Sequence, residues 1–147
     1  MIYVNSVVHA VYTTISSFQT VINCGINVNF YDIINTDPNQ SPWIDILSPN
    51  VPIIPWRSNI SQPWKAEYNI PIITQVYHAG DISNQWAAIQ ELDELTNIVM
   101  SSVNCNRTLD NMVNIITGWD VNPYDRNDIE SDIFLMNIIT LKAEVFA

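Results

Sequence analysis

The sequence predicts an α+β fold in which two helices pack on one face of a mainly antiparallel sheet, with an extended proline-rich arm. Two segments, 4–22 and 82–103, carry apolar residues at steps of three and four, the period of a helix face. Four other segments alternate apolar and polar side chains, as half-buried strands do: 26–31, 66–76, 111–119 and 133–145. The last two strands follow each other without a helix between them, which favours a hairpin. With 147 residues, 48% of them hydrophobic, residues 1–147 are expected to form a single domain.

The N-terminal helix is predicted from one apolar stripe: Val4, Val7, Val8, Val11, Ile15, Phe18 and Ile22. Its β-branched residues lower the helix propensity, so burial of the stripe has to hold the helix together. Residues 23–25 are the expected stop, because Gly25 can adopt the left-handed conformation that ends many helices. A half-buried strand is predicted next, in which Ile26, Val28 and Phe30 alternate with polar residues.

The segment from about residue 38 to residue 64 is rich in proline and tryptophan. Seven of the eight prolines lie between Pro38 and Pro71, and proline excludes a helix and disfavours a central strand. We therefore expect an extended arm that reaches away from the core. Its apolar residues are the candidates for contact with another subunit or a partner, because tryptophan is enriched at such interfaces: Trp43, Ile44, Ile46, Ile53, Ile54, Trp56 and Trp64.

Two alternatives for the tryptophans stay open at this point. They could pack against their own domain, since tryptophan side chains are usually largely buried. They could also form a carbohydrate-binding platform from Trp43, Trp56 and Trp64, because sugars stack on exposed aromatic rings.

The stretch VYHAGDISNQW, residues 76–86, contains a histidine, an aspartate and a serine that suggest a hydrolase site. A strand that turns at Gly80 into a helix capped by Asp81 or Ser83 explains the same residues without any chemistry. No nucleophile motif is present, and residues so close around a turn seldom converge as a triad does. The strand-to-helix interpretation is preferred, with Pro71 suggesting an edge position or a bulge in the strand.

The C-terminal third is predicted to be a hairpin. Residues 109–119 fit a helix or a strand, and a strand from about 111 to 119 is favoured because the strong strand at 133–145 needs a partner. The connection between them is expected to be a polar loop that contains four acidic residues, Asp125, Asp128, Glu130 and Asp132. It lacks the central glycine and closing glutamate of a calcium-binding loop, so a solvated loop is expected.

Composition and motif searches reveal no catalytic, cofactor or metal site. The formal net charge of −10 opposes electrostatic binding to nucleic acid. Three glycines form no phosphate-binding loop, and the two histidines and two cysteines give no zinc motif. The carboxylates Glu91, Asp93 and Glu94 could serve glycoside chemistry, but their place on a polar helix face favours plain solvation. Neither a signal peptide nor a membrane span is predicted.

The order of elements resembles that of the tail terminator (tail completion) proteins of long-tailed bacteriophages. The resemblance lies in VNSVVHAVYTTISSFQTVI leading into INVNFY, in IITQVYHAGDISNQWAAIQELDELTNIV, and in the closing pair MVNIITGW and FLMNIITLKAEVF. These segments span nearly the whole chain, and the resemblance is one of pattern and length rather than of a diagnostic motif. The proline-rich segment departs from the family, because it is longer and more hydrophobic than a plain hairpin loop.

The resemblance implies a structural virion protein with no catalytic residues and no cofactor. It implies a homo-oligomeric ring, six-fold in that family, that caps the tail tube and docks the head's neck. The partners would be other copies of the chain, the tail tube protein and the head-closure or neck protein, with DNA passing through the lumen unbound. The protein would be made in the bacterial host cytoplasm and would reside at the head–tail junction. Another neck or head–tail connector component is the alternative within the virion.

Overall fold

The computed structural model of the protein describes residues 4–30, 38–55, 64–79, 85–129 and 132–146. Its helices are α1 (Val4–Ser16), α2 (Gln19–Asn23) and α3 (Gln85–Asn104), with a short 3-10 turn, η1, at Pro38–Gln40. Its strands are β1 (Asn27–Phe30), β2 (Trp43–Ile46), β3 (Ile53–Pro55), β4 (Trp64–His78), β5 (Ile115–Ile129) and β6 (Asp132–Phe146). The predicted α+β class is confirmed.

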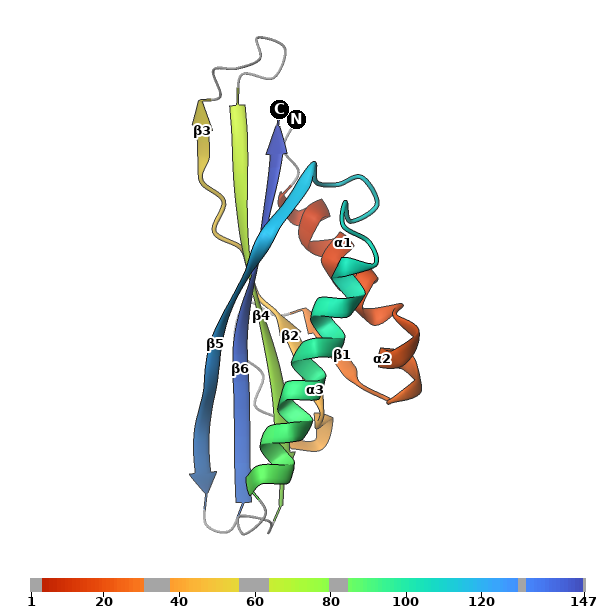
Figure 1. Ribbon diagram of the computed structural model, residues 1–147, viewed down its shortest axis with the longest axis vertical. Coiled ribbons are helices and arrows are strands. Elements are labelled where there is room, and N and C mark those ends of the chain that lie inside the picture. The colour runs from red at the N-terminus through yellow and green to blue at the C-terminus, as the bar shows by residue number, and fades with distance from the viewer. Residues whose placement is uncertain (1–3, 31–37, 56–63, 80–84, 130–131, 147) are drawn as a thin grey trace.

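The strands form one open sheet in the order β1-β2-β4-β6-β5, with β3 pairing with β4 beyond the end of β2. Every pairing is antiparallel except that between β1 and β2. Strands β4, β5 and β6 have 15 residues each and form a long twisted ribbon (Figure 1). At 3.3–3.4 Å per residue such a strand spans about 50 Å. The helices lie along only part of this length, and β3 with the start of β4 extends beyond them (Figure 1).

The core lies between the helices and one face of the sheet. Alternate residues of β4 and β6, such as Ile72 and its partner Ile139, point to that face and are fully buried. The predicted helix stripes meet them through Val11 and Ile15 of α1 and Leu92 of α3. Both predicted segments are therefore helical, although the first is interrupted at residues 17–18, because burial of one face compensates for modest propensity.

The N-terminal helix is divided into two pieces. Helix α1 ends at Ser16, and Phe18 has an extended backbone with φ −65° and ψ 128° before α2 begins. The Ser17 amide and hydroxyl both donate to the Thr13 carbonyl, at 3.0 Å and 2.6 Å, at the end of α1. The predicted stop is confirmed: Gly25 has φ +63°, and the Ile26 amide bonds back to the Val21 carbonyl at 3.1 Å.

The first half of the predicted arm belongs to the sheet. Strand β2 pairs with β1 on one side and β4 on the other, and all four of its side chains are buried. Ile44 and Ile46 join the core on the helix side, while Trp43 packs against Phe134 at a ring-centroid distance of 5.6 Å. The prediction that Trp43, Ile44 and Ile46 lie on a contact surface is therefore wrong, because their own chain covers them.

The predicted acidic loop is largely strand. Strand β5 continues to Ile129, so Asp125 and Asp128 lie within it, opposite Met136 and Ile133 of β6. Asp132 begins β6, and Glu130 lies outside the described residues. Register shifts at 116–118 and 122–125 are the cause of the error, since each shift changes which residues face the core and hides the alternation.

Pro71 lies in an interior strand and not at an edge as predicted. It pairs with Thr140 of β6, and its carbonyl accepts the Leu47 amide at 2.9 Å. In an antiparallel strand the N–H and C=O of one residue point to the same side. The missing N–H therefore faces the point where β2 has already ended, and no hydrogen bond of the sheet is lost.

Candidate interaction surfaces

The described part of the chain contains no grouping of three histidine, cysteine, aspartate or glutamate side chains suited to a metal ion. Within those same ranges, no helix combines the length and apolar character needed to cross a membrane. Cys24 and Cys105 are free and exposed.

The histidine of the suspected hydrolase stretch has a structural role. The His78 ring, at the end of β4, lies 2.5 Å from the Glu91 carboxylate of α3, so the pair joins strand and helix. The neighbouring Tyr77 hydroxyl donates to Asp132, and this hydrogen bond raises the pKa of Tyr77. Asp81 and Ser83 lie outside the described residues. The Tyr77 and His78 side chains thus both have partners that join elements of the fold.

A buried carboxylate lies on the sheet face opposite the helices. Asp45 is fully buried, and its two carboxylate oxygens accept from the side-chain amides of Gln75, at 2.7 Å, and Asn29, at 3.1 Å. Asn29 also donates to Gln40 at 2.6 Å. Because amide donors surround this carboxylate inside the sheet, its place is structural: it fixes the register of β1, β2 and β4.

The β3 end patch, which we define as Ile53, Ile54 and Trp64, is an exposed apolar surface. Its exposed fractions are 52%, 38% and 49%, although isoleucine and tryptophan are usually buried. Pairing of Ile53 with Ala66 and of Pro55 with Trp64 brings these residues together at the end of the sheet that extends beyond the helices (Figure 1). Trp56, the remaining tryptophan of the predicted arm, lies outside the described residues.

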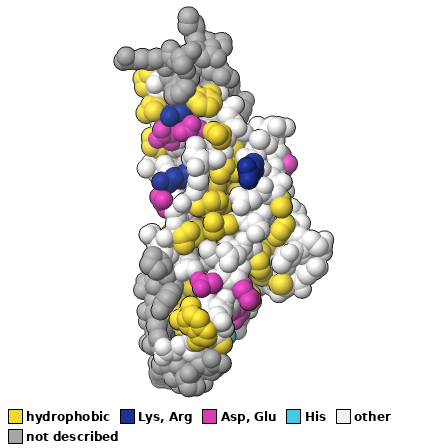
Figure 2. All heavy atoms as spheres, viewed as in Figure 1, with side chains coloured by type: hydrophobic (Ala, Val, Ile, Leu, Met, Phe, Trp, Pro, Cys, Tyr) yellow, Lys and Arg dark blue, Asp and Glu magenta, His cyan; other side chains and the backbone are white. Residues whose placement is uncertain are grey.

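Charged side chains lie next to this patch. Lys65 contacts Glu67 at 3.1 Å and Glu144 at 3.4 Å. The hydrogen bond to Glu67 raises the pKa of Lys65 most, burial opposes that rise, and the negative charge of Glu144 adds to it. Lys142 pairs with Asp120 at 2.7 Å. Figure 2 shows hydrophobic, basic and acidic side chains side by side at this upper end, and a hydrophobic band along the middle of the same face. An apolar patch rimmed by charges is typical of a protein-binding surface.

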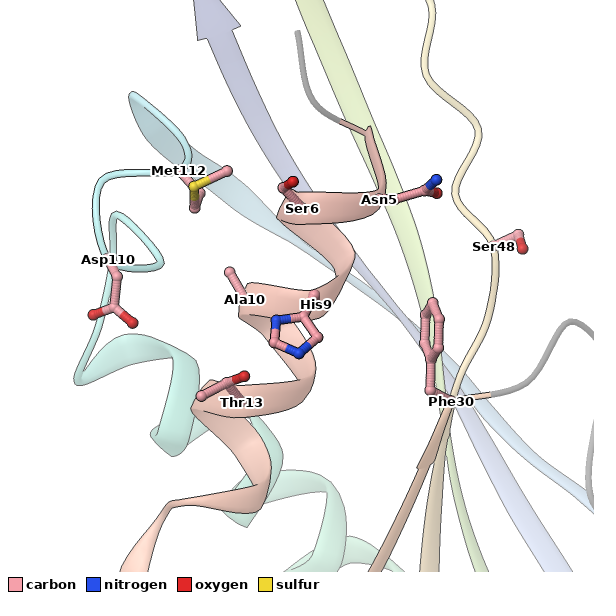
Figure 3. A pocket seen from close by; sticks show the side chains of 9 residues that line it. All are labelled: Asn5, Ser6, His9, Ala10, Thr13, Phe30, Ser48, Asp110 and Met112. Atoms are coloured by element: carbon pink, nitrogen blue, oxygen red, sulfur yellow. The ribbon is translucent and has the colours of Figure 1, made fainter.

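A second, shallower surface surrounds the exposed side of α1 (Figure 3). It is an open depression of 910 Å³ between Asn5 and His9 of α1, Phe30 at the end of β1, Ser48, and Met112. Phe30 is 51% exposed. The His9 ring lies 6.3 Å from that of Tyr12, and Asp110, which lines the same depression, accepts a hydrogen bond from the Asn106 side-chain amide at 3.1 Å.

No protein-family model matches the chain, and no curated protein matches it. Among solved structures, a chain of the virion of a native gene transfer agent (GTA) particle is similar, with a TM-score of 0.44 and 9% sequence identity. The alignment covers 93% of this chain and 93% of that chain. A likeness this low carries no functional argument, so the function depends on the residues of the chain itself.

Proposed function

We propose that the chain is a structural subunit of a phage virion, a tail terminator that assembles with copies of itself into a ring. The ring caps the tail tube and joins it to the neck of the head, and DNA passes through its lumen. The order of helices and strands supports the proposal, because the predicted elements that resemble this family lie in the fold in the predicted order.

The observation that carries the proposal is the β3 end patch. Exposed apolar surface gains about 25 cal/mol for each Å² that a partner covers. Ile53 and Trp64 are about half exposed at one end of an elongated sheet. By contrast, β2, which belongs to the same proline-rich segment, is buried at all four of its residues. The fold thus completes its own core and leaves this end for a second protein.

The charge of the chain suits a channel for DNA. A net charge of −10 repels the phosphate backbone, so DNA would slide past without binding. We propose that the acidic end of the β5–β6 hairpin, with Asp125, Asp128 and Asp132, faces the lumen or a partner.

Another neck or head–tail connector component remains the second candidate, since the β3 end patch would serve either assembly. The carbohydrate platform is weakened, because Trp43 is fully buried and offers no ring face to a sugar.

Paired variants test the proposal. Ile53→Ser should weaken binding to purified tail tubes and to other copies, measured by co-sedimentation and by mass in solution. Ile22→Ser is the matched control, because Ile22 is exposed to a similar degree, 56%, but lies on α2. Equal effects of the two variants would contradict a specific role for the β3 end patch.

A further inference from the structure

A small pocket lies between the C-terminal end of α3 and the first residues of β5. It has a volume of 230 Å³ and is lined by Asn104, Arg107, Ile116, Thr117, Gly118 and Trp119. Arg107 follows α3, and Trp119 lies in β5 opposite Leu141, with its side chain partly buried. The pocket therefore joins one cationic side chain to one aromatic wall.

The charged group of this pocket has no partner among the described residues. Among the cations whose side chains are described, Lys65 and Lys142 each contact a carboxylate, whereas Arg107 makes no ion pair or hydrogen bond with any described residue. The Trp119 indole N–H is also buried without an acceptor in the described ranges. Both groups are donors only, so a ligand of this pocket would have to be a hydrogen-bond acceptor.

The shape and chemistry of a guanidinium select the acceptor. Arginine binds planar carboxylates through two parallel hydrogen bonds, and it is the cation favoured in aromatic-walled interfaces. Phosphate and nucleic acid are disfavoured by the net charge of −10. The acceptor is therefore expected to be a carboxylate presented by a protein.

A second copy of the chain supplies such carboxylates. Asp93 and Glu94 lie on the exposed side of α3, and neither has an ion-pair partner among the described residues. They lie 11 and 10 residues, respectively, before Asn104 on the same helix, which is about 16 Å at 1.5 Å per residue. Donor and acceptor surfaces are thus separate patches, as a head-to-tail contact in a ring requires.

Apolar surface beside the pocket would shield such an ion pair. Val121 lies two residues after Trp119 in β5, so both side chains point to the same face of the sheet, and Val121 is 48% exposed. Helix α3 packs on β4 and β6 and leaves the β5 edge uncovered (Figure 1). An ion pair that is surrounded by buried apolar groups contributes more to the binding free energy than an ion pair exposed to solvent.

We infer that the Arg107 pocket receives a carboxylate of a second copy of this chain, from Asp93 or Glu94, and so forms part of the contact between neighbouring subunits. This inference rests on the proposed self-assembly and names the residues that would make the contact between neighbouring subunits head-to-tail.

Charge reversal tests the inference on the full-length chain. Arg107→Glu should weaken self-association about tenfold or more, as measured by sedimentation velocity over a concentration series. The double variant Asp93→Lys/Glu94→Lys should weaken it similarly, and combining both sets of changes should restore association. Thr20→Glu is the control, because Thr20 is exposed on α2, outside both proposed contact surfaces, and the added charge should leave association unchanged.

The outcomes separate this inference from the proposed function. If the wild-type chain assembles and Arg107→Glu assembles equally well, the pocket is not a subunit contact, although the ring proposal survives. If the wild-type chain stays monomeric at every concentration and on tail tubes, both fail. Circular dichroism of Arg107→Glu, and of the milder Arg107→Gln, checks that the exposed substitution leaves the fold intact.

Discussion

The side-chain amide of Asn137 in β6 donates a hydrogen bond to the Thr96 hydroxyl of α3 at 3.0 Å. The Thr96 hydroxyl donates to the Leu92 carbonyl at 3.0 Å, so it accepts from both Asn137 and the Thr74 hydroxyl, which lies 2.9 Å away. All three side chains are buried. This polar cluster fixes the position of α3 on β4 and β6 more specifically than apolar packing alone, because each member needs the others.

Thr96→Val should therefore destabilise the fold. The substitution keeps the shape but leaves the Thr74 hydroxyl and the Asn137 amide without their shared acceptor, at a cost of about 1–3 kcal/mol in the free energy of unfolding. Urea denaturation followed by circular dichroism measures it. Thr13→Val is the control, since Thr13 is an exposed threonine in α1; a loss of equal size there would refute the role of the cluster.

Asp45→Asn should destabilise the sheet where β1, β2 and β4 meet. The substitution replaces one carboxylate oxygen by an NH₂ group that meets an amide donor of Gln75 or Asn29. Hydrogen bonds to a charged group are worth about 1.5–3 kcal/mol, so a loss of about 2 kcal/mol in unfolding free energy is expected. Asp93→Asn, on the exposed side of α3, should change stability little; a neutral result for Asp45→Asn would contradict its structural role.

Trp43→Ala and Trp64→Ala should have opposite profiles. Trp43 is fully buried against Phe134, so its removal should cost about 3–5 kcal/mol of stability. Trp64 is 49% exposed, so its removal should leave the melting temperature nearly unchanged but weaken assembly. Thermal melts measure the stability of both variants, and sedimentation measures their assembly. A Trp64→Ala chain that melts at a lower temperature yet still assembles would place the Trp64 indole in the core.

Stability should fall at alkaline pH. Burial raises the pKa of Tyr68 above 10.0, and the hydrogen bond to Asp132 raises that of Tyr77. Groups whose folded pKa exceeds the unfolded value stabilise fully below the unfolded pKa, and this contribution is lost as pH rises through the folded pKa. The free energy of unfolding should thus decline from about pH 10 upward.

Tyr68→Phe isolates the buried phenol. Its hydroxyl is buried without a described hydrogen-bond partner, so the variant should keep or slightly gain stability at neutral pH and show a shallower alkaline decline. Urea denaturation at a series of pH values measures both effects. Tyr12→Phe, a partly exposed tyrosine of α1, is the control, and an unchanged alkaline slope in Tyr68→Phe would contradict the assignment.

Regular periodicity made the helices, β1, β4 and β6 predictable. The stripes through Val11 and Leu92 and the alternation through Ile72 and Ile139 each report a single buried face. Strand β2 is not predictable from periodicity, because it is only four residues long and buried on both faces and so shows no alternation of apolar and polar residues. Strand β5 was cut short because two register shifts break its alternation.

The surfaces were harder to predict than the elements. Ile53, Ile54 and Trp64 were identified by composition, but composition could not separate them from Trp43, because burial is decided by partners distant in the sequence. The Arg107 pocket was missed altogether. With only five basic residues in the chain, the sequence indicates no basic surface, and whether one arginine meets a carboxylate depends on contacts distant in the sequence.

The mass of the assembled protein tests the central proposal most directly. Sedimentation velocity of the full-length chain, alone and with tail tubes, combined with negative-stain imaging, would measure it. The account predicts a closed ring of copies, in solution or on the end of the tube. A chain that remains a monomer under both conditions, with no rings and no capped tubes, would contradict it.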